Sequence, residues 1–109
     1  MYEHVYYEKL RGRPEYKDIP QGVYDSMVRY VVNHLLPGSF LKAVIENDLM
    51  QAIAYADDDS LRSMRAISKF FWNHTPNDCW GSTERFKAHI ESKGFKPRFA
   101  VNPYQKEVA

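Results

Sequence analysis

The side chains able to do acid–base, nucleophilic or metal chemistry are few and scattered in this sequence. Cys79 is the only cysteine, which excludes an intrachain disulfide and a zinc site built on thiolates. No base adjoins Cys79 in the local sequence, so beside Trp80 it is expected to be a small buried apolar residue. The histidines are His4, His34, His74 and His89. None has the His-x-x-x-His or Glu-x-x-His spacing that would place two metal ligands on one helix face.

The acidic run at residues 57–59 and the single carboxylate of Asp48 are also candidates for a functional role. Asp57-Asp58-Asp59-Ser60 favours a helix start, because acidic residues complement the positive end of the helix dipole. The rival is a divalent-cation site, but the run lacks the alternating ligands and distal Glu of an EF-hand loop. Asp48 would form an acid–base pair with His34 or His74 only if the fold brought them together.

Phosphate-binding and nucleophile motifs are missing. The sequence contains no Gly-x-x-x-x-Gly-Lys loop, no Gly-x-Ser-x-Gly elbow and no paired-glycine dinucleotide signature. We therefore expect no catalytic, cofactor-binding or metal-binding residue, and a protein that is not an enzyme. A small enzyme or nucleotide binder is the least favoured function.

Composition indicates one globular domain. The chain has 109 residues, 44% of them hydrophobic and 27% charged, with a net charge of +1. That suffices for a core and gives no overall field to attract nucleic acid or membrane. No secretory signal and no apolar run of membrane-spanning length is present, so a soluble protein of a reducing compartment is expected.

Helical periodicity dominates the middle of the chain. A first helix is expected from just after Pro20 to about Leu36, ended by Pro37 and a turn at Gly38. A second runs from Ser39, its expected N-cap, to about residue 56. A third covers residues 60–73, and a fourth starts at Ser82 and closes at residues 93–94.

Asp48 falls inside the apolar stripe of the second expected helix, with Asn47 beside it. A buried carboxylate needs a partner, so Asp48 is predicted to pair with Arg29 or to cap a neighbouring helix. Five residues are assigned to helix starts and one buried polar network. They are Ser39, Asn47, Asp48, Trp80 and Ser82.

The two ends are expected to differ from the helical middle. Residues 1–20 read as an irregular aromatic arm, in which alternation permits a short strand before Gly12, Pro14 and Pro20. Residues 95–109 read as a short, mildly basic, extended tail. The predicted fold is all-α, a compact bundle of about four helices over residues 21–94, flanked by that arm and tail.

The order of several short motifs resembles a family of short proteins of tailed bacteriophages and prophages. The family pattern is Ile-Pro … Pro-Gly-x-Phe-Leu-x-Ala-Val-Leu-x-Asn-Asp-Leu … Ala-Asp … Trp-Gly-Ser. Here it is carried by Ile19-Pro20, the segments 37–49 and 56–57, and Trp80-Gly81-Ser82, with Ile45 in place of one Leu. The resemblance spans roughly residues 11–90. It implies an accessory phage protein in the cytoplasm of an infected bacterium, and it carries no established activity.

We therefore expect binding to a macromolecular partner: a host defence or metabolic protein, or a phage protein, that the chain inhibits or modulates. The expected contact residues are Tyr6, Tyr7, Arg11, Arg13, Arg62, Arg65 and Lys69. A nucleic-acid-binding regulator of phage gene expression is the alternative, although a helix with Lys42 as its only base makes a poor DNA reader. A homo-oligomer is compatible with these expectations, and a membrane partner is not expected.

Overall fold

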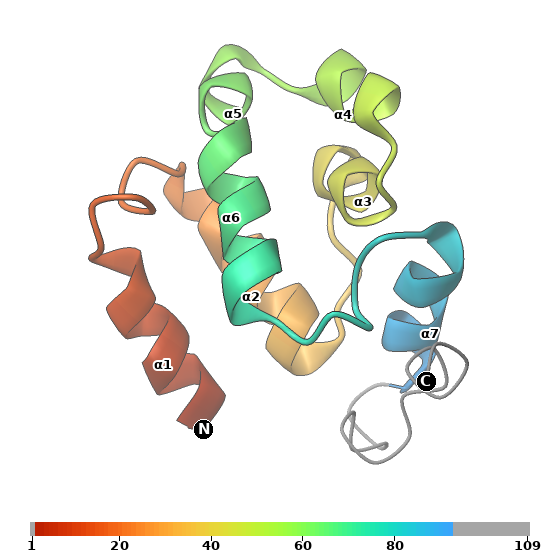
Figure 1. Ribbon diagram of the computed structural model, residues 1–109, viewed down its shortest axis with the longest axis horizontal. Helices are drawn as coiled ribbons and strands as arrows, with labels where there is room; N and C mark the ends of the chain where they lie inside the picture. The colour runs from red at the N-terminus through yellow and green to blue at the C-terminus, as the bar shows by residue number, and fades with distance from the viewer. Residues whose placement is uncertain (1, 93–109) are drawn as a thin grey trace.

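The computed structural model describes residues 2–92, and within this range the chain forms seven α-helices and no strand (Figure 1). The all-α class is confirmed, whereas the expected number of about four helices is wrong. The helices are α1 (Tyr2–Arg11), α2 (Gln21–Asn33), α3 (Ser39–Ile45), α4 (Leu49–Tyr55), α5 (Asp58–Arg62), α6 (Met64–His74) and α7 (Thr83–Ser92). The expected tail of residues 95–109 and the helix end at residues 93–94 lie outside the described residues.

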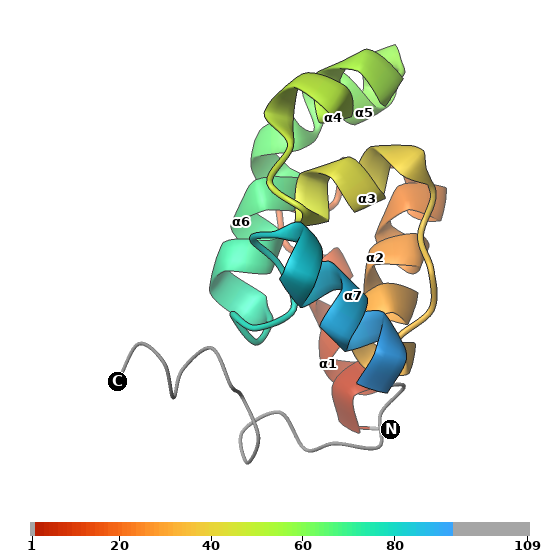
Figure 2. The ribbon, with the colours of Figure 1, turned by 90° about the vertical axis from the view of Figure 1, so that its right-hand side faces the viewer.

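The core lies between α1, α2 and α6 on one side and α3 and α7 on the other (Figures 1 and 2). Aromatic side chains fill much of it: Phe70 of α6 packs on Tyr7 and Tyr24 with ring centroids 5.3 and 5.5 Å apart. Tyr30 of α2 stacks on Phe86 of α7 at 5.6 Å. Cys79 is fully buried, as its sequence context predicts. No helix within the described range is long and apolar enough to cross a membrane.

The expected irregular N-terminal arm is a helix from Tyr2 to Arg11, followed by turns up to Pro20. Tyr7 and Leu10, three residues apart, are both buried and turn one face of α1 toward the core. The hydroxyl of Tyr24 in α2 donates to the backbone oxygen of Tyr7 at 2.5 Å. The alternation of side-chain types in residues 2–8 permitted a strand, but the segment is helical, and the burial of Tyr7 and Leu10 on one face stabilises that helix.

The second expected helix is divided into α3 and α4 at residues 46–48. Asn47 adopts a left-handed conformation with φ of 66°, which ends α3 and reverses the chain. Asp48 is the N-cap of α4, and its carboxylate accepts from the backbone N–H of Gln51 at 3.2 Å. The predicted capping role of Asp48 is therefore confirmed, whereas the predicted buried network is wrong, because Asp48 is partly exposed and Asn47 exposed. Asp48, a polar residue inside an apolar stripe, therefore marks the start of a new helix.

The other helix boundaries also differ from expectation. His34 caps α2 in a left-handed conformation, so this helix ends at Asn33 and not at Leu36. Gly38, and not Ser39, is the N-cap of α3. Ser63 separates α5 from α6, where one helix was expected.

Asp57 is the N-cap of α5, which confirms the prediction that the acidic run starts a helix. Its carboxylate accepts from the backbone N–H of Ser60 at 2.7 Å, and this hydrogen bond lowers the pKa of Asp57. No group of three His, Cys, Asp or Glu side chains able to hold a metal ion occurs among residues 2–92. The acidic run is therefore explained by the start of α5.

Candidate partner-binding surface

Helix α4 is apolar in sequence yet lies on the surface. Of its seven residues only Ala52 is buried. Met50 is 79% exposed, Leu49 62% and Ile53 45%. Residues 49 and 53, and 50 and 53, are one turn apart, so the three side chains share one side of the helix. We call them the α4 patch.

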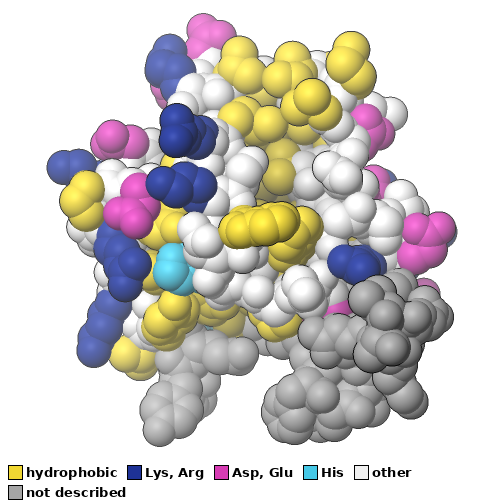
Figure 3. Space-filling view, viewed as in Figure 1, with side chains coloured by type: hydrophobic (Ala, Val, Ile, Leu, Met, Phe, Trp, Pro, Cys, Tyr) yellow, Lys and Arg dark blue, Asp and Glu magenta, His cyan; other side chains and the backbone are white. Residues whose placement is uncertain are grey.

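The position of α4 explains why this patch is exposed. The helix packs against α3 at the margin of the molecule, away from α1 and the C-terminal half of α6 (Figures 1 and 2). Hydrophobic side chains gather over α4 and its surroundings in the space-filling view (Figure 3). Leu61 of α5 is also exposed, whereas Tyr55 lies on the other side of α4, where it lines a hollow with residues of α2 and α3. Isolated exposed apolar residues are ordinary, but a cluster of this kind marks an interaction surface.

A second feature runs along α5 and α6. Arg65, Lys69 and Trp72 follow one another at intervals of four and three residues, which places them along one face of α6, and Arg62 at the end of α5 precedes them. We call these four residues the α6 stripe, and Lys and Arg side chains gather in this region of Figure 3. Arg62 forms an ion pair with Asp59, whereas no hydrogen bond or ion pair within residues 2–92 engages Arg65 or Lys69. The stripe thus offers two exposed cations beside an indole.

Trp72 is 74% exposed and its ring packs against that of Trp80, with ring centroids 5.6 Å apart. Three hydrogen bonds fix the loop that carries Trp80. Tyr30 donates to the backbone oxygen of Cys79 at 2.6 Å, and Gly81 N–H donates to the backbone oxygen of Ile45 at 2.7 Å. The hydroxyl of Ser82 accepts from the backbone N–H of Arg85 at 3.1 Å at the start of α7. This fixed loop supports Trp72 in its exposed position.

The N-terminal residues that were expected to join this contact surface do not lie beside the α6 stripe. Tyr7 is only 4% exposed and belongs to the core. Tyr6 is exposed, and its hydroxyl bonds Nδ1 of His74 at 2.7 Å, at the far end of α6 from Arg62. Arg11 donates to the backbone oxygen of Tyr16 at 3.0 Å and lies over the ring of Tyr24. Arg13 is exposed. The structure therefore groups Arg62, Arg65 and Lys69 but separates them from Tyr6 and Tyr7.

Two histidines form a buried structural pair that the sequence did not reveal. The rings of His34 and His89 stack with centroids 3.9 Å apart. Nδ1 of His34 lies 2.7 Å from the backbone oxygen of His89, and Nε2 of His89 lies 2.6 Å from that of Tyr30. A carbonyl only accepts, so each of these ring nitrogens donates. The pair joins α2 to α7, and Asp48 caps α4 elsewhere, so no acid–base pair with His34 forms.

His74 differs from that pair because it lies near the surface. Burial lowers the pKa of its imidazole, and the charge of Arg13 lowers it further. Its backbone oxygen accepts from the hydroxyl of Tyr7 at 2.6 Å. His74 therefore connects α6 to α1. Since His34, His74 and His89 all make structural contacts of this kind, we take the α4 patch and the α6 stripe as the candidate functional surface.

Comparison with known proteins adds no relative to this picture: no protein-family model, curated protein or solved structure matches the chain.

Proposed function

We propose that this protein acts by stoichiometric binding to another protein, with the α4 patch at the centre of the interface and the α6 stripe at its rim. The observation that carries the proposal is the exposure of Leu49, Met50 and Ile53 on a helix that buries only Ala52. Covering the exposed parts of these three side chains would contribute roughly 3–5 kcal/mol to association. Aliphatic anchors surrounded by polar residues are typical of protein interfaces.

The charges around the patch favour a particular partner surface. Arg65 and Lys69 are cations without a partner in the described part of the chain, and they attract carboxylates. The best complement is an apolar groove with acidic side chains opposite Arg65 and Lys69 and basic side chains opposite Asp57, Asp58 and Asp59. The resemblance to short phage proteins supports a host defence or metabolic protein as the owner of that groove, inhibited or modulated in the cytoplasm of an infected bacterium.

A nucleic-acid partner is the second candidate, because Trp72 beside Arg65 and Lys69 combines a stacking surface with phosphate-binding cations. Three features favour protein over nucleic acid. The α4 patch has no base of its own, Asp57, Asp58 and Asp59 follow directly, and the net charge is only +1. Phosphates would be repelled by that acidic run.

The proposal is tested by capture from bacterial lysate with the wild-type chain and with Met50→Ser as bait. Leu36→Ser is the matched control, since Leu36 is 70% exposed but lies outside the patch. We expect one protein to be retained by the wild type and the control and lost with Met50→Ser. Retention by all three baits would contradict the assignment of the patch. Binding to single-stranded DNA or RNA that weakens steeply with salt would replace the proposal with the second candidate.

A further inference from the structure

A row of four ring side chains joins α2 to α7. Phe86 of α7 stacks on Tyr30 of α2 with ring centroids 5.6 Å apart and an interplanar angle of 11°. Tyr30 in turn lies 4.4 Å from His89 of α7, and His89 lies 3.9 Å from His34 at the end of α2. The rings therefore come alternately from the two helices, so the row holds α7 against α2.

Hydrogen bonds show where each imidazole of the row carries its proton. Nδ1 of His34 donates to the backbone oxygen of His89 at 2.7 Å, and Nε2 of His89 donates to that of Tyr30 at 2.6 Å. The hydroxyl of Ser92 donates to the same oxygen of His89 at 2.9 Å and lies 2.9 Å from Nδ1 of His34. A neutral imidazole has one N–H, so both contacts between the helices are made while the rings are uncharged.

The surroundings of the two rings oppose a positive charge on either of them. Both histidines are only 5% exposed, and burial disfavours the charged form of an imidazole. Two charges on rings 3.9 Å apart would also repel each other. Arg85 lies one turn before His89 on the same side of α7 and adds a further positive charge. A proton is therefore accommodated best when His89 leaves α2 and reaches water.

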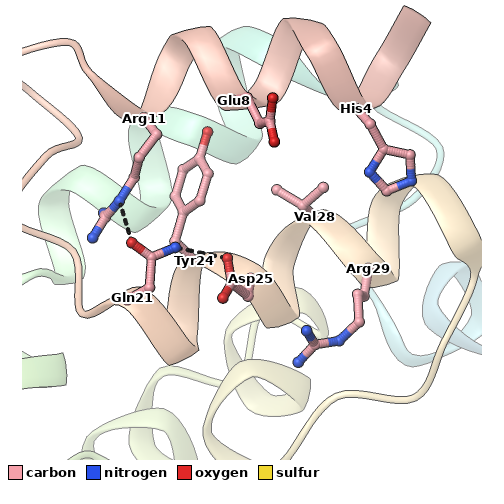
Figure 4. A pocket seen from close by; sticks show the side chains of 8 residues that line it. All are labelled: His4, Glu8, Arg11, Gln21, Tyr24, Asp25, Val28 and Arg29. Carbon is pink, nitrogen blue, oxygen red and sulfur yellow. Dashed lines mark hydrogen bonds between the residues drawn. The ribbon is translucent and has the colours of Figure 1, made fainter. Parts of the chain in front are cut away.

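Carboxylates on the helices around the pair are poorly placed to neutralise such a charge. Asp25 of α2 lies between α1 and α2, where it accepts a hydrogen bond at 2.7 Å (Figure 4). Glu91 follows the histidine of α7 by two residues and so lies on a different side of that helix. Glu46 of α3 forms an ion pair with Lys42 at 3.1 Å. The other charged side chains of α2 and α7 are Arg29, which extends away from α1 in Figure 4, and the exposed Glu84 and Lys87.

Helix α7 depends on this row more than the other helices do. Its buried side chains are Phe86 and His89, both members of the row. The ring contacts that join α1, α2 and α6 centre on Phe70, which packs on Tyr7 and Tyr24, and they include no side chain of α7. Figure 2 shows α7 on the outside of the molecule. Loss of the histidine contacts thus removes one of the two buried attachments of α7 and leaves the packing around Phe70 intact.

We propose that the His34–His89 pair is an acid-sensitive switch that releases α7 from α2. The attachment is complete at neutral pH and is lost as pH falls through the range of about 6 to 4, when a ring takes up a second proton. The proposal is independent of the protein-binding function assigned to the α4 patch, because neither histidine belongs to that patch or to the α6 stripe.

The test is amide hydrogen exchange of the full ¹⁵N-labelled chain at pH 7, 6, 5 and 4, with rates corrected for the intrinsic effect of pH. Protection of the α7 amides should fall at least about tenfold more than that of the α2 and α6 amides. The ring signals of His34 and His89 should titrate over the same pH range. Undiminished protection of α7 at pH 4, or an equal loss in α2, α6 and α7, would overturn the proposal.

A double variant, His34→Asn with His89→Gln, separates the charge from the hydrogen bonds. Each amide places a donor near the original ring N–H, and neither is protonated in this pH range. Protection of α7 in this variant should change less than about threefold between pH 7 and pH 4. His4→Asn, at an exposed position of α1, and His74→Gln are controls that should lose α7 protection as the wild type does.

The pH-7 amide spectrum checks that the double variant is folded. If it is folded, a loss of α7 protection at the same pH as in the wild type would contradict the switch. If it is not folded, the wild-type exchange profile and the titration of the two ring signals decide alone: release of α7 at a pH where neither ring titrates would also overturn the proposal.

Discussion

Tyr24→Phe tests how α1 is attached to the rest of the fold. The side chain is 3% exposed, and its hydroxyl donates to the backbone oxygen of Tyr7. The substitution removes this hydrogen bond but keeps the ring against Phe70. A buried hydrogen bond contributes about 1 kcal/mol net, so the free energy of unfolding should fall by about that amount at pH 8. This corresponds to a decrease in Tm of about 4–8 °C for a domain of this size.

The same residue predicts a dependence on alkaline pH. Burial raises the pKa of Tyr24 to about 12 from 10.0, although the Arg11 guanidinium acts in the opposite direction. The unfolded chain therefore loses the proton first, and the stabilisation is complete below pH 10 and lost as pH rises to about 12. Two pKa units correspond to at most about 2.7 kcal/mol. Screening by solvent reduces this value, and about 1–1.5 kcal/mol is expected.

Urea unfolding of wild type and Tyr24→Phe at pH 8, 10 and 11 measures both effects. The advantage of the wild type should be about 1 kcal/mol at pH 8 and should narrow steadily above pH 10. Tyr55→Phe, on an exposed tyrosine, is the control and should stay within about 0.5 kcal/mol of wild type throughout. A difference between wild type and Tyr24→Phe that is the same at pH 8 and pH 11 would refute this reasoning.

Two further predictions concern caps and protonation. Asp48→Ala removes the N-cap of α4 and should lower the free energy of unfolding by about 1 kcal/mol, whereas Asp58→Ala, at an exposed first-turn position, should cost less; equal Tm values for the two variants would contradict the capping role. For His74, whose pKa is lowered by burial, stability should be complete above about pH 6.5 and decline as pH falls through the lower folded-state pKa. Thermal melts at pH 7.5, 6 and 5 should show a smaller decline for His74→Gln than for wild type, and an equal decline would remove His74 as a source of acid sensitivity.

Local signals predicted the helical class and several helix starts. Ser82 and Asp57 lie where helices begin, because capping and dipole interactions act within one turn and are visible in the sequence. The division at residues 46–48 was missed, since an apolar stripe continued through it while Asn47 took a left-handed conformation. Helix α1 was missed because its burial depends on Tyr24 and Phe70, which are distant in sequence.

The candidate surface was only partly predictable. Arg62 lies on α5, before the break at Ser63, but the spacing of Arg65 and Lys69 on one face of α6 is a local property and could be read directly from the sequence. The exposure of the α4 patch could not, because the same apolar pattern is expected of a helix buried in the core. Which side of α4 faces water is decided by its packing on α3 at the margin of the fold. Tertiary contacts, and not periodicity, therefore identify the patch.

The most direct test of the proposed function is the dissociation constant of the purified complex between this chain and the captured partner, measured for wild type, Met50→Ser and Leu36→Ser. Met50 is 79% exposed, and its burial at the centre of an interface should contribute about 1.5–2 kcal/mol. Met50→Ser should therefore weaken the complex at least about tenfold, while Leu36→Ser changes it less than about twofold. Equal affinities for the wild type and Met50→Ser would contradict the assignment of partner binding to the α4 patch.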